Sequence, residues 1–310
     1  MRSLKEEKVL LGPSTFAALD HAPLERLVET GCMVIENPYK RKLTKSELLV
    51  LLSDNVTGLI AGLEPIDREV LKKTNLKVIS RCGSGMSNVD IEAAKELGIK
   101  VFSTPYGPTS AVAELTLGAL LSLLRMIPLM DRDFHEGKWN KKIGTQLEGK
   151  TIVIIGFGRI GRRLAELLAP FKTRILVVDP FLQDSKEQFP LLTLKEALPQ
   201  ADIITLHSSG TDQIIGPREF ALMKQGVFLL NAARGELINE GSILNALDSG
   251  QVAGAWLDTF EREPYEGLLS HYEQVILTPH IGSYTYEGRL QMEMDAAENL
   301  IQGFQERAAG

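Results

Sequence analysis

Three side chains that could move a proton or stabilise charge follow predicted strands in the second half of the chain. Arg234 comes shortly after an apolar run that ends at Asn231, Glu263 comes shortly after a run that ends at Asp258, and His280 directly follows a third run. Parallel strands end at one edge of their sheet, where ligands of open α/β sheets bind. The three side chains are therefore expected to converge there.

These residue types suit a hydride transfer that is coupled to a proton transfer. Histidine titrates near neutral pH, so His280 is the expected acid and base, with Glu263 orienting its ring. Arg234 could bind a carboxylate or carbonyl oxygen and stabilise developing negative charge. Each residue alone could be a solvated loop charge or a structural histidine. Their predicted convergence favours a catalytic trio.

A glycine-rich turn predicts where the hydride carrier binds. Gly156, Gly158 and Gly161 form a G-x-G-x-x-G turn between the predicted strand 151–155 and a predicted helix at 160–169. Such a turn lets a pyrophosphate approach the backbone at a helix N-terminus. Asp179 ends the next predicted strand, where a carboxylate binds the adenosine ribose and repels a 2′-phosphate. The pattern predicts NAD as the cofactor, whereas the alternative is a turn needed only for packing.

Two series of alternating strands and helices must position these residues. The first series has predicted strands at 9–11, 33–35, 59–61, 78–80 and 100–102, and the second has them at 151–155, 175–179, 202–206, 227–231, 253–258 and 275–278. Such alternation is typical of parallel sheets with helices on both faces. We therefore predict an α/β protein with two doubly wound parallel-sheet domains, the first flavodoxin-like and the second a Rossmann domain.

A long stretch rich in Ala and Leu, residues 110–137, separates the two series and predicts a long helix with a kink or break near Pro128. A final amphipathic helix is predicted over 286–307. The predicted domains are residues 1–103 with 284–310, and residues 104–283.

Composition excludes several classes of protein. The 310 residues include 34 Lys and Arg against 40 Asp and Glu, a net charge of -6 that argues against a general nucleic-acid binder. The two cysteines, Cys32 and Cys82, are too few for a disulfide framework or a metal knuckle. No secretory signal is evident, and the longest apolar stretch, 115–124, is short for a membrane span. We expect a cytoplasmic protein with no membrane, nucleic-acid or metal partner.

Ordered motifs along nearly the whole chain resemble those of the D-2-hydroxyacid dehydrogenase family. They are residues 77–90, 112–114, 137–139, the glycine turn, 231–235, 258–264 and 278–282. The resemblance implies that Arg234, Glu263 and His280 are the catalytic trio, and that the Ser84 and Gly85 N–H groups bind the substrate carboxylate. It also implies a hinged substrate domain and NAD-binding domain, and a homodimer built on the 110–137 helix. Further NAD contacts implied by it are Arg159, Ile160, Asp179, Ser208, Ala232, Asp258 and Gly282.

The substrate is a separate question. The sequence resembles bacterial members that act on D-3-phosphoglycerate at Arg81 and in the basic segment Lys40, Arg41 and Lys42. A run of charged residues is as often a solvated surface, so this segment could bind phosphate or simply face water. Glu64 stands in a loop where such members often carry arginine, which weakens a phosphate site.

The substrate expectation is D-3-phosphoglycerate, with glyoxylate or hydroxypyruvate reduction as the alternative and an NAD(H)-sensing corepressor as the alternative from another class. Since the sequence ends at residue 310, an appended regulatory domain is not expected.

Overall fold

The computed structural model describes residues 4–182 and 188–307. The chain divides into two compact units. Unit 1 comprises Met1–Pro108 with Ser283–Gly310, and unit 2 comprises Thr109–Gly282. The breaks predicted after residues 103 and 283 lie close to the observed ones, after residues 108 and 282. Residues 1–3 and 308–310 of the predicted substrate domain lie outside the described residues.

Unit 1 is a five-stranded parallel sheet in the order β2-β1-β3-β4-β5. Its strands are β1 (Lys8–Leu11), β2 (Met33–Glu36), β3 (Gly58–Ala61), β4 (Val78–Arg81) and β5 (Lys100–Ser103). This is the flavodoxin-like order, in which the winding direction reverses between β1 and β3. The predicted fold class of unit 1 is therefore confirmed.

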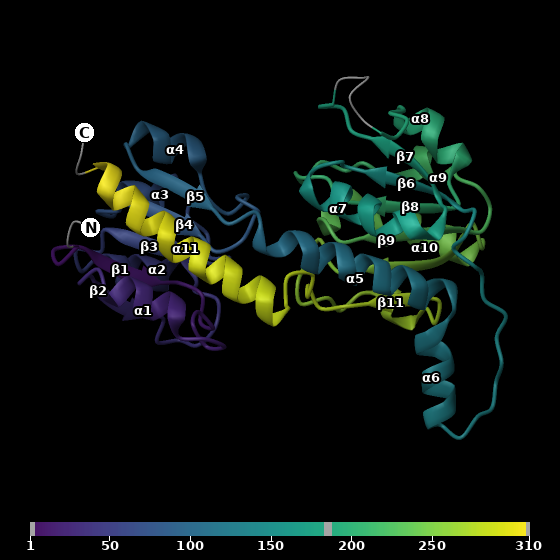
Figure 1. Ribbon diagram of the computed structural model, residues 1–310, viewed down its shortest axis with the longest axis horizontal. Helices are drawn as coiled ribbons and strands as arrows, with labels where there is room; N and C mark the ends of the chain where they lie inside the picture. Colours follow the sequence, from purple (N-terminus) through teal and green to yellow (C-terminus); the bar gives the residue numbers. More distant parts are fainter. Residues whose placement is uncertain (1–3, 183–187, 308–310) are drawn as a thin grey trace. The chain divides into compact units, whose positions relative to one another are not determined.

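Helices cover both faces of the unit 1 sheet (Figure 1). On one face, α1 (Ala22–Val28) and α11 (Tyr286–Arg307) pack on Val9, Leu11, Ile60 and Val78. On the other face lie α2 (Lys45–Leu52), α3 (Arg68–Lys72) and α4 (Ile91–Glu96). Every residue of β3 and β4 is buried, which explains why β3 is apolar without alternation; β4 begins with Val78 and Ile79 and ends in the buried polar residues Ser80 and Arg81.

Unit 2 is a six-stranded parallel sheet in the order β11-β10-β9-β8-β6-β7. Its strands are β6 (Thr151–Ile155), β7 (Arg174–Val178), β8 (Ile203–Leu206), β9 (Val227–Asn231), β10 (Val252–Leu257) and β11 (Val275–Leu277). On the outer side of the edge strand β7, a parallel bridge joins Val177 of that strand to Leu191. That bridge lies where a Rossmann sheet has its third strand. The strand order shows that the winding direction reverses between β6 and β8.

The helices of unit 2 also lie on both faces of its sheet. One face carries α5 (Gly107–Leu124) and α7 (Arg159–Leu168), and the other carries α8 (Leu194–Ala197), α9 (Pro217–Phe220) and α10 (Glu240–Asp248). The short 3-10 helices of this unit are η1 (Ala169–Phe171), η2 (Leu198–Gln200), η3 (Gly235–Leu237) and η4 (Leu268–His271).

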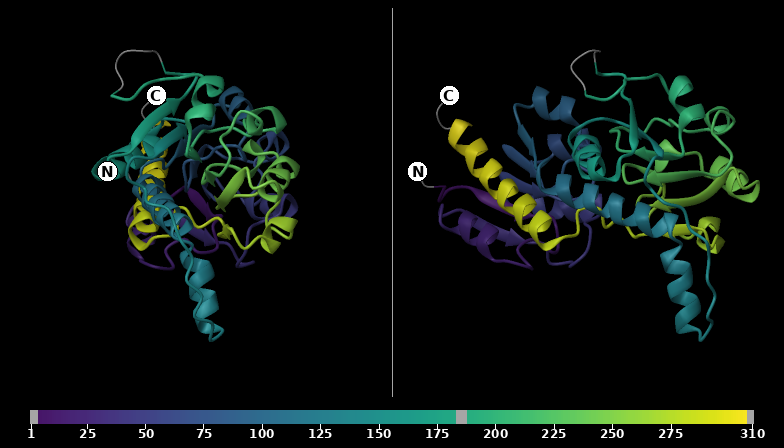
Figure 2. Two further views of the ribbon diagram at one scale, coloured as in Figure 1. Left: turned by 90° about the vertical axis from the view of Figure 1, so that its right-hand side faces the viewer. Right: turned by 45° about the vertical axis from the view of Figure 1, so that its right-hand side comes forward.

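The long helix predicted over 110–137 is two helices, α5 and α6 (Ile127–His135). The break is at Met126, whose φ of 51° is left-handed, and Pro128 lies in the first turn of α6, where a proline is tolerated. Figure 2 shows α6 and the segment after it running away from the sheet of unit 2.

Helix α5 is the one helix in the described part of the chain that is long and apolar enough to cross a membrane, judged by length and composition only. It has 18 residues with a mean hydropathy of 1.3. Core helices of globular proteins pass the same test.

Candidate active site

The three glycines of the 156–161 turn have different roles in the structure. Gly156 has a φ of 89°, and a Cβ there would overlap the backbone of Ser208 after β8. A Cβ at Gly161 would overlap the carbonyl of Gly156, so both positions need glycine for packing. Gly158 is the N-cap of α7, and a Cβ there would meet nothing within 4 Å. Two glycines therefore close the turn, and the third leaves open space at a helix N-terminus.

Asp179 directly follows β7, which ends one residue earlier than predicted. Its Oδ2 accepts a hydrogen bond from the Phe157 N–H at 2.8 Å, and its Oδ1 accepts one from the Phe181 N–H at 3.0 Å. The carboxylate is thus fixed beside the glycine turn.

Three buried polar atoms at the same edge have no hydrogen-bond partner among the described residues. They are the Ser208 Oγ and His207 Nδ1 after β8 and the Thr259 Oγ1 after β10. Buried polar atoms are rarely left unpaired in a folded protein unless a ligand or water pairs them. Together with the open space at Gly158, they fit a polar dinucleotide such as NAD. Burial lowers the pKa of His207 to about 4, so its ring is neutral at physiological pH.

His280 and Glu263 form the pair that the sequence predicts. His280 Nδ1 lies 3.0 Å from Glu263 Oε2, and both side chains are partly exposed, at 41% and 37%. The Phe260 N–H holds Glu263 Oε1 at 3.1 Å. His280 has a φ of 53°, a left-handed conformation that is unusual for a residue other than glycine. With Nδ1 engaged by the carboxylate, Nε2 is the ring atom that can exchange a proton with a substrate.

Arg234 is partly buried at the carboxyl end of β9. Its backbone carbonyl accepts a hydrogen bond from the Asn231 amide at 2.8 Å, and its Nη1 donates to the carbonyl of Ala233 at 2.6 Å. The next residue, Gly235, lies so close to the backbone of Phe260 that a Cβ there would overlap it. The loop that carries Arg234 is therefore packed against the loop that carries Glu263.

The other residues predicted to contact the cofactor also lie at this edge. Arg159 and Ile160 begin α7, and Ala232 directly follows β9. Asp258 is buried, and its Oδ2 accepts a hydrogen bond from the Gly282 N–H at 2.8 Å. One lone pair of that oxygen remains for a further donor, such as an amide of a bound cofactor.

Unit 1 holds the predicted substrate residues. Arg81 ends β4 with an exposed fraction of 9%, and its guanidinium lies against Gly83 and hydrogen-bonds to the Cys82 carbonyl. Ser84 and Gly85 follow on a loop that Thr104 anchors through a 2.6 Å hydrogen bond from the Gly83 N–H. Among the described residues, the N–H groups of Ser84 and Gly85 have no partner. Both N–H groups can therefore donate hydrogen bonds to a carboxylate.

The basic segment after β2 is only partly suited to phosphate. Arg41 forms a two-pronged ion pair with Glu47, at 2.9 and 2.6 Å, and Glu47 also caps α2 through the Thr44 N–H. These contacts lower the pKa of Glu47 to about 2. Arg41 is thus engaged in local structure, which weakens its predicted part in a phosphate site.

Sequence patterns did not indicate the environment of Glu64. Its carboxylate is 1% exposed and lies between Gly12 after β1 and Gly62 after β3, where its Oε1 accepts the Gly62 N–H at 2.8 Å. Burial raises its pKa, while the Gly62 N–H and the charges of Arg81 and Lys42 oppose the rise. A buried carboxylate thus stands near the arginine expected to bind substrate.

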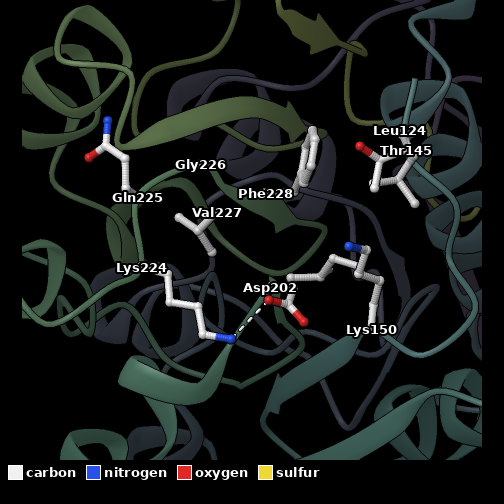
Figure 3. Close-up of a pocket in the computed structure, with 10 residues that line it drawn as sticks. Leu124, Thr145, Lys150, Asp202, Lys224, Gln225, Gly226, Val227 and Phe228 are labelled. Carbon is white, nitrogen blue, oxygen red and sulfur yellow. Dashed lines mark hydrogen bonds and ion pairs between the residues drawn. The ribbon is translucent and has the colours of Figure 1, made fainter. Parts of the chain in front are cut away.

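Two further observations limit the site. A cavity of about 220 Å³ lies at the opposite, amino-terminal edge of the unit 2 sheet, where Lys224 pairs with Asp202 beside Lys150 (Figure 3). Ligands of such sheets bind at the other edge, so this cavity is separate from the trio. In residues 4–182 and 188–307, no group of His, Cys, Asp or Glu could hold a metal ion.

Comparisons with known proteins agree with this geometry. Residues 117–282 match the family model described as D-isomer specific 2-hydroxyacid dehydrogenase, NAD binding domain. The chain is 38% identical over 304 residues to a D-3-phosphoglycerate dehydrogenase of Sus scrofa, covering 95% of this chain but 56% of that protein. It is 34% identical to a hydroxypyruvate reductase of Thermotoga maritima, covering 84% of this chain and 88% of that protein.

A solved glyoxylate reductase from Paecilomyes thermophila superposes with a TM-score of 0.86 at 30% identity, covering 97% of this chain and 95% of that one. The chain spans little more than half the length of the phosphoglycerate dehydrogenase that it matches. Fold, motifs and matched residues agree, and the chain belongs to the D-isomer specific 2-hydroxyacid dehydrogenase family.

Proposed function

We propose that the protein is an NAD-dependent dehydrogenase that interconverts a D-2-hydroxy acid and its 2-keto acid. The observation that carries this proposal is the His280 and Glu263 pair, held with Arg234 at the edge of the sheet that also bears the open glycine turn. In this role unit 2 is the cofactor domain, and unit 1 binds the substrate through Arg81, Ser84 and Gly85.

The chemistry assigns one step to each residue. NAD, when bound, accepts the hydride from the substrate C2 carbon. As the C–H bond breaks, His280 Nε2 takes the hydroxyl proton and the C–O bond becomes a carbonyl; in the reverse direction His280 returns the proton. Glu263 stabilises the imidazolium form through Nδ1, and Arg234 stabilises the negative charge on the substrate oxygen.

A spectrophotometric panel at 340 nm tests the proposal. D-3-phosphoglycerate, D-lactate, D-glycerate, hydroxypyruvate and glyoxylate are each offered with NAD(H) and with NADP(H). His280→Ala is expected to lower turnover about 10²–10⁴-fold, with little change in NADH affinity. His271→Ala, which removes an exposed histidine of the same unit, is the matched control. No turnover of any acid despite NADH binding would contradict a dehydrogenase and favour an NAD(H)-sensing corepressor.

D-3-phosphoglycerate is the first substrate candidate, because relatives of that name match 95% of the chain and Arg81 ends β4 in unit 1. Reduction of glyoxylate or hydroxypyruvate is the second, because Glu64 offsets the charge of Arg81 and Arg41 is paired with Glu47. Arg81→Ala is expected to lower kcat/KM far more for the phosphorylated acid than for glyoxylate. Equal losses would remove Arg81 as a phosphate ligand.

We further infer a homodimer in the cytoplasm. Support for the dimer comes from the exposed Phe134, Trp139 and Ile143 on and after α6, the last of them 96% exposed. Apolar side chains gathered on a projecting segment are typical of a subunit interface. The free thiols of Cys32 and Cys82 support a reducing compartment. The net charge of -6 supports a protein without nucleic-acid or membrane partners. Sedimentation velocity tests the dimer.

A further inference from the structure

His280 is held in an unfavourable backbone conformation, and its loop must be fixed by contacts outside the ring. Its φ of 53° is in the left-handed region, which is unfavourable for any residue with a Cβ because the Cβ comes too close to the following carbonyl oxygen. Its own N–H donates to the Thr278 carbonyl at 2.9 Å, which closes a tight turn. The next two N–H groups, of Ile281 and Gly282, both donate to the carboxylate of Asp258, at 2.9 and 2.8 Å. The position of the Asp258 carboxylate therefore sets the path of the loop on the C-terminal side of His280.

The Asp258 carboxylate is itself oriented by a hydroxyl. Thr278 Oγ1 lies 2.6 Å from Asp258 Oδ1, and the indole Nε1 of Trp256 lies 3.0 Å from the same hydroxyl. An indole N–H only donates, and an ionised carboxylate only accepts. The Thr278 hydroxyl must therefore accept from Trp256 and donate to Asp258, so its proton has one direction.

The far end of this chain of hydrogen bonds is rigid. Trp256 has no exposed surface and packs in the core between the sheet of unit 2 and the helices α5 and α7. Its strand β10 is paired with β11, and the Thr278 N–H extends that pairing to the Leu257 carbonyl at 3.1 Å. The near end is equally close-packed, since a Cβ at Gly282 would lie 3.1 Å from both Asp258 Oδ2 and Val112 Cγ2.

We propose that Thr278, oriented by Trp256, is a positioning residue that fixes the Asp258 carboxylate and through it the backbone that carries His280. The hydroxyl does not touch the reacting atoms. It acts through Asp258, whose Oδ1 it holds. The Oδ2 of Asp258 accepts from the Gly282 N–H and keeps one lone pair for a cofactor donor. The inference rests on the proposed function, because it concerns the placement of the proposed proton-transfer group.

The test is Thr278→Val, which keeps the shape of the side chain and removes the hydroxyl. The expected result is a 10- to 100-fold fall in kcat with less than a threefold change in KM for the acid, because a misplaced His280 slows proton transfer more than binding. Thr278→Ser restores the hydroxyl and is expected to return kcat to within about threefold of the parent. Trp256→Phe, which removes the indole N–H together with one ring of the side chain, is expected to lower kcat less than Thr278→Val.

Thr116→Val is the matched control, because Thr116 is a buried threonine of the same unit whose hydroxyl donates to the Val112 carbonyl within α5. A kcat for Thr278→Val within twofold of the parent would overturn the proposal, as would equal losses in Thr278→Val and Thr278→Ser. If Thr278→Val does not fold, Trp256→Phe decides: a fall in kcat with less than a threefold change in KM supports the proposal, and an unchanged kcat overturns it. Absence of turnover in the parent protein would instead contradict the proposed function.

Discussion

The two sheets place different chemistry at the same topological position. In unit 1 the winding reverses between β1 and β3, and the space after these strands is filled by the carboxylate of Glu64, which fits only because Gly12 and Gly62 have no Cβ. In unit 2 the winding reverses between β6 and β8, and the space at Gly158 is open. The general rule that ligands bind at such a point holds for a sheet only where the chain does not fill the point itself.

The electrostatics of the two positions differ in the same way. At Gly158 the N-terminus of the ten-residue helix α7 offers N–H groups and a positive dipole end to an anion. At Glu64 the chain supplies its own anion, which accepts the Gly62 N–H and lies near Arg81 and Lys42. Unit 2 is thus prepared for a ligand phosphate, whereas unit 1 has satisfied part of its positive charge internally.

A side chain placed at Gly158, the open position of unit 2, should produce the largest effect, a loss of NADH affinity. Gly158→Asp places a carboxylate where the cofactor phosphate is proposed to bind, and we expect NADH affinity to fall by about 100-fold or more through charge repulsion. The φ of Gly158 is −75°, and aspartate is a better N-cap than glycine, so stability should rise by a few tenths of a kcal/mol. Calorimetric titration with NADH and thermal unfolding measure the two effects separately.

Gly158→Ser is the control for that experiment, because serine also caps a helix but carries no charge. It should weaken NADH binding much less than aspartate does. If the aspartate variant binds NADH within threefold of the parent, the glycine turn is not the cofactor site.

A side chain added beside Glu64, the filled position of unit 1, should have an intermediate effect, a loss of stability. Gly12→Ala forces the Cβ against Glu64 Oε1 and to 3.0 Å from the Ile60 carbonyl, and should cost about 1–3 kcal/mol of unfolding free energy. Glu64→Ala should cost about the same, because it leaves the buried Gly62 N–H without an acceptor. In the double variant the losses should fall short of their sum by at least 0.5 kcal/mol, since the clash and the hydrogen bond share one carboxylate.

Urea unfolding checks this coupling, with two probes that separate the units. The two tryptophans, Trp139 and Trp256, both lie in unit 2, so their fluorescence follows that unit, while circular dichroism follows both. Gly118→Ala, whose Cβ meets nothing within 4 Å, is the control and should be neutral or slightly stabilising. Additive losses would mean that Glu64 does not depend on Gly12.

The open position could be predicted from sequence and the filled one could not. The 156–161 turn, its flanking strands and Asp179 are all local in sequence, and their spacing alone predicts the ligand. The Glu64 niche joins Gly12 to residues 62 and 64, and no local pattern links them. The same applies to the contact between Trp256 and Thr278, which depends on the pairing of β10 with β11.

One local feature was open to prediction and was missed. The Thr44 and Glu47 pair has the spacing of a capping box, which would have placed Glu47 near the basic segment and reduced the expected role of Arg41 in binding phosphate. The break predicted near Pro128 is present between α5 and α6, and it lies two residues earlier, at Met126, because a proline fits the first turn of α6. The proposed trio was predicted from strand ends, because a parallel sheet brings the ends of its strands to one edge whatever the length of the connections.

The smallest effect concerns how the filled position responds to pH. Burial raises the pKa of Glu64 above the ordinary value of 4.5, so between 4.5 and the raised value the folded chain keeps a proton that the unfolded chain has lost. Stability must then fall as pH rises through that interval. Glu64→Gln removes the titration and keeps an acceptor for the Gly62 N–H, so the variant should gain stability relative to the parent from pH 4.5 upward.

Glu47→Gln is the control of opposite sign. The folded-state pKa of Glu47 is about 2, so its contribution to stability is constant above pH 4.5 and is lost only below that pH. Urea midpoints from pH 3 to 7.5 measure both differences, and a pH-independent difference between Glu64→Gln and the parent would show that unit 1 does not bury a charge at its reversal point.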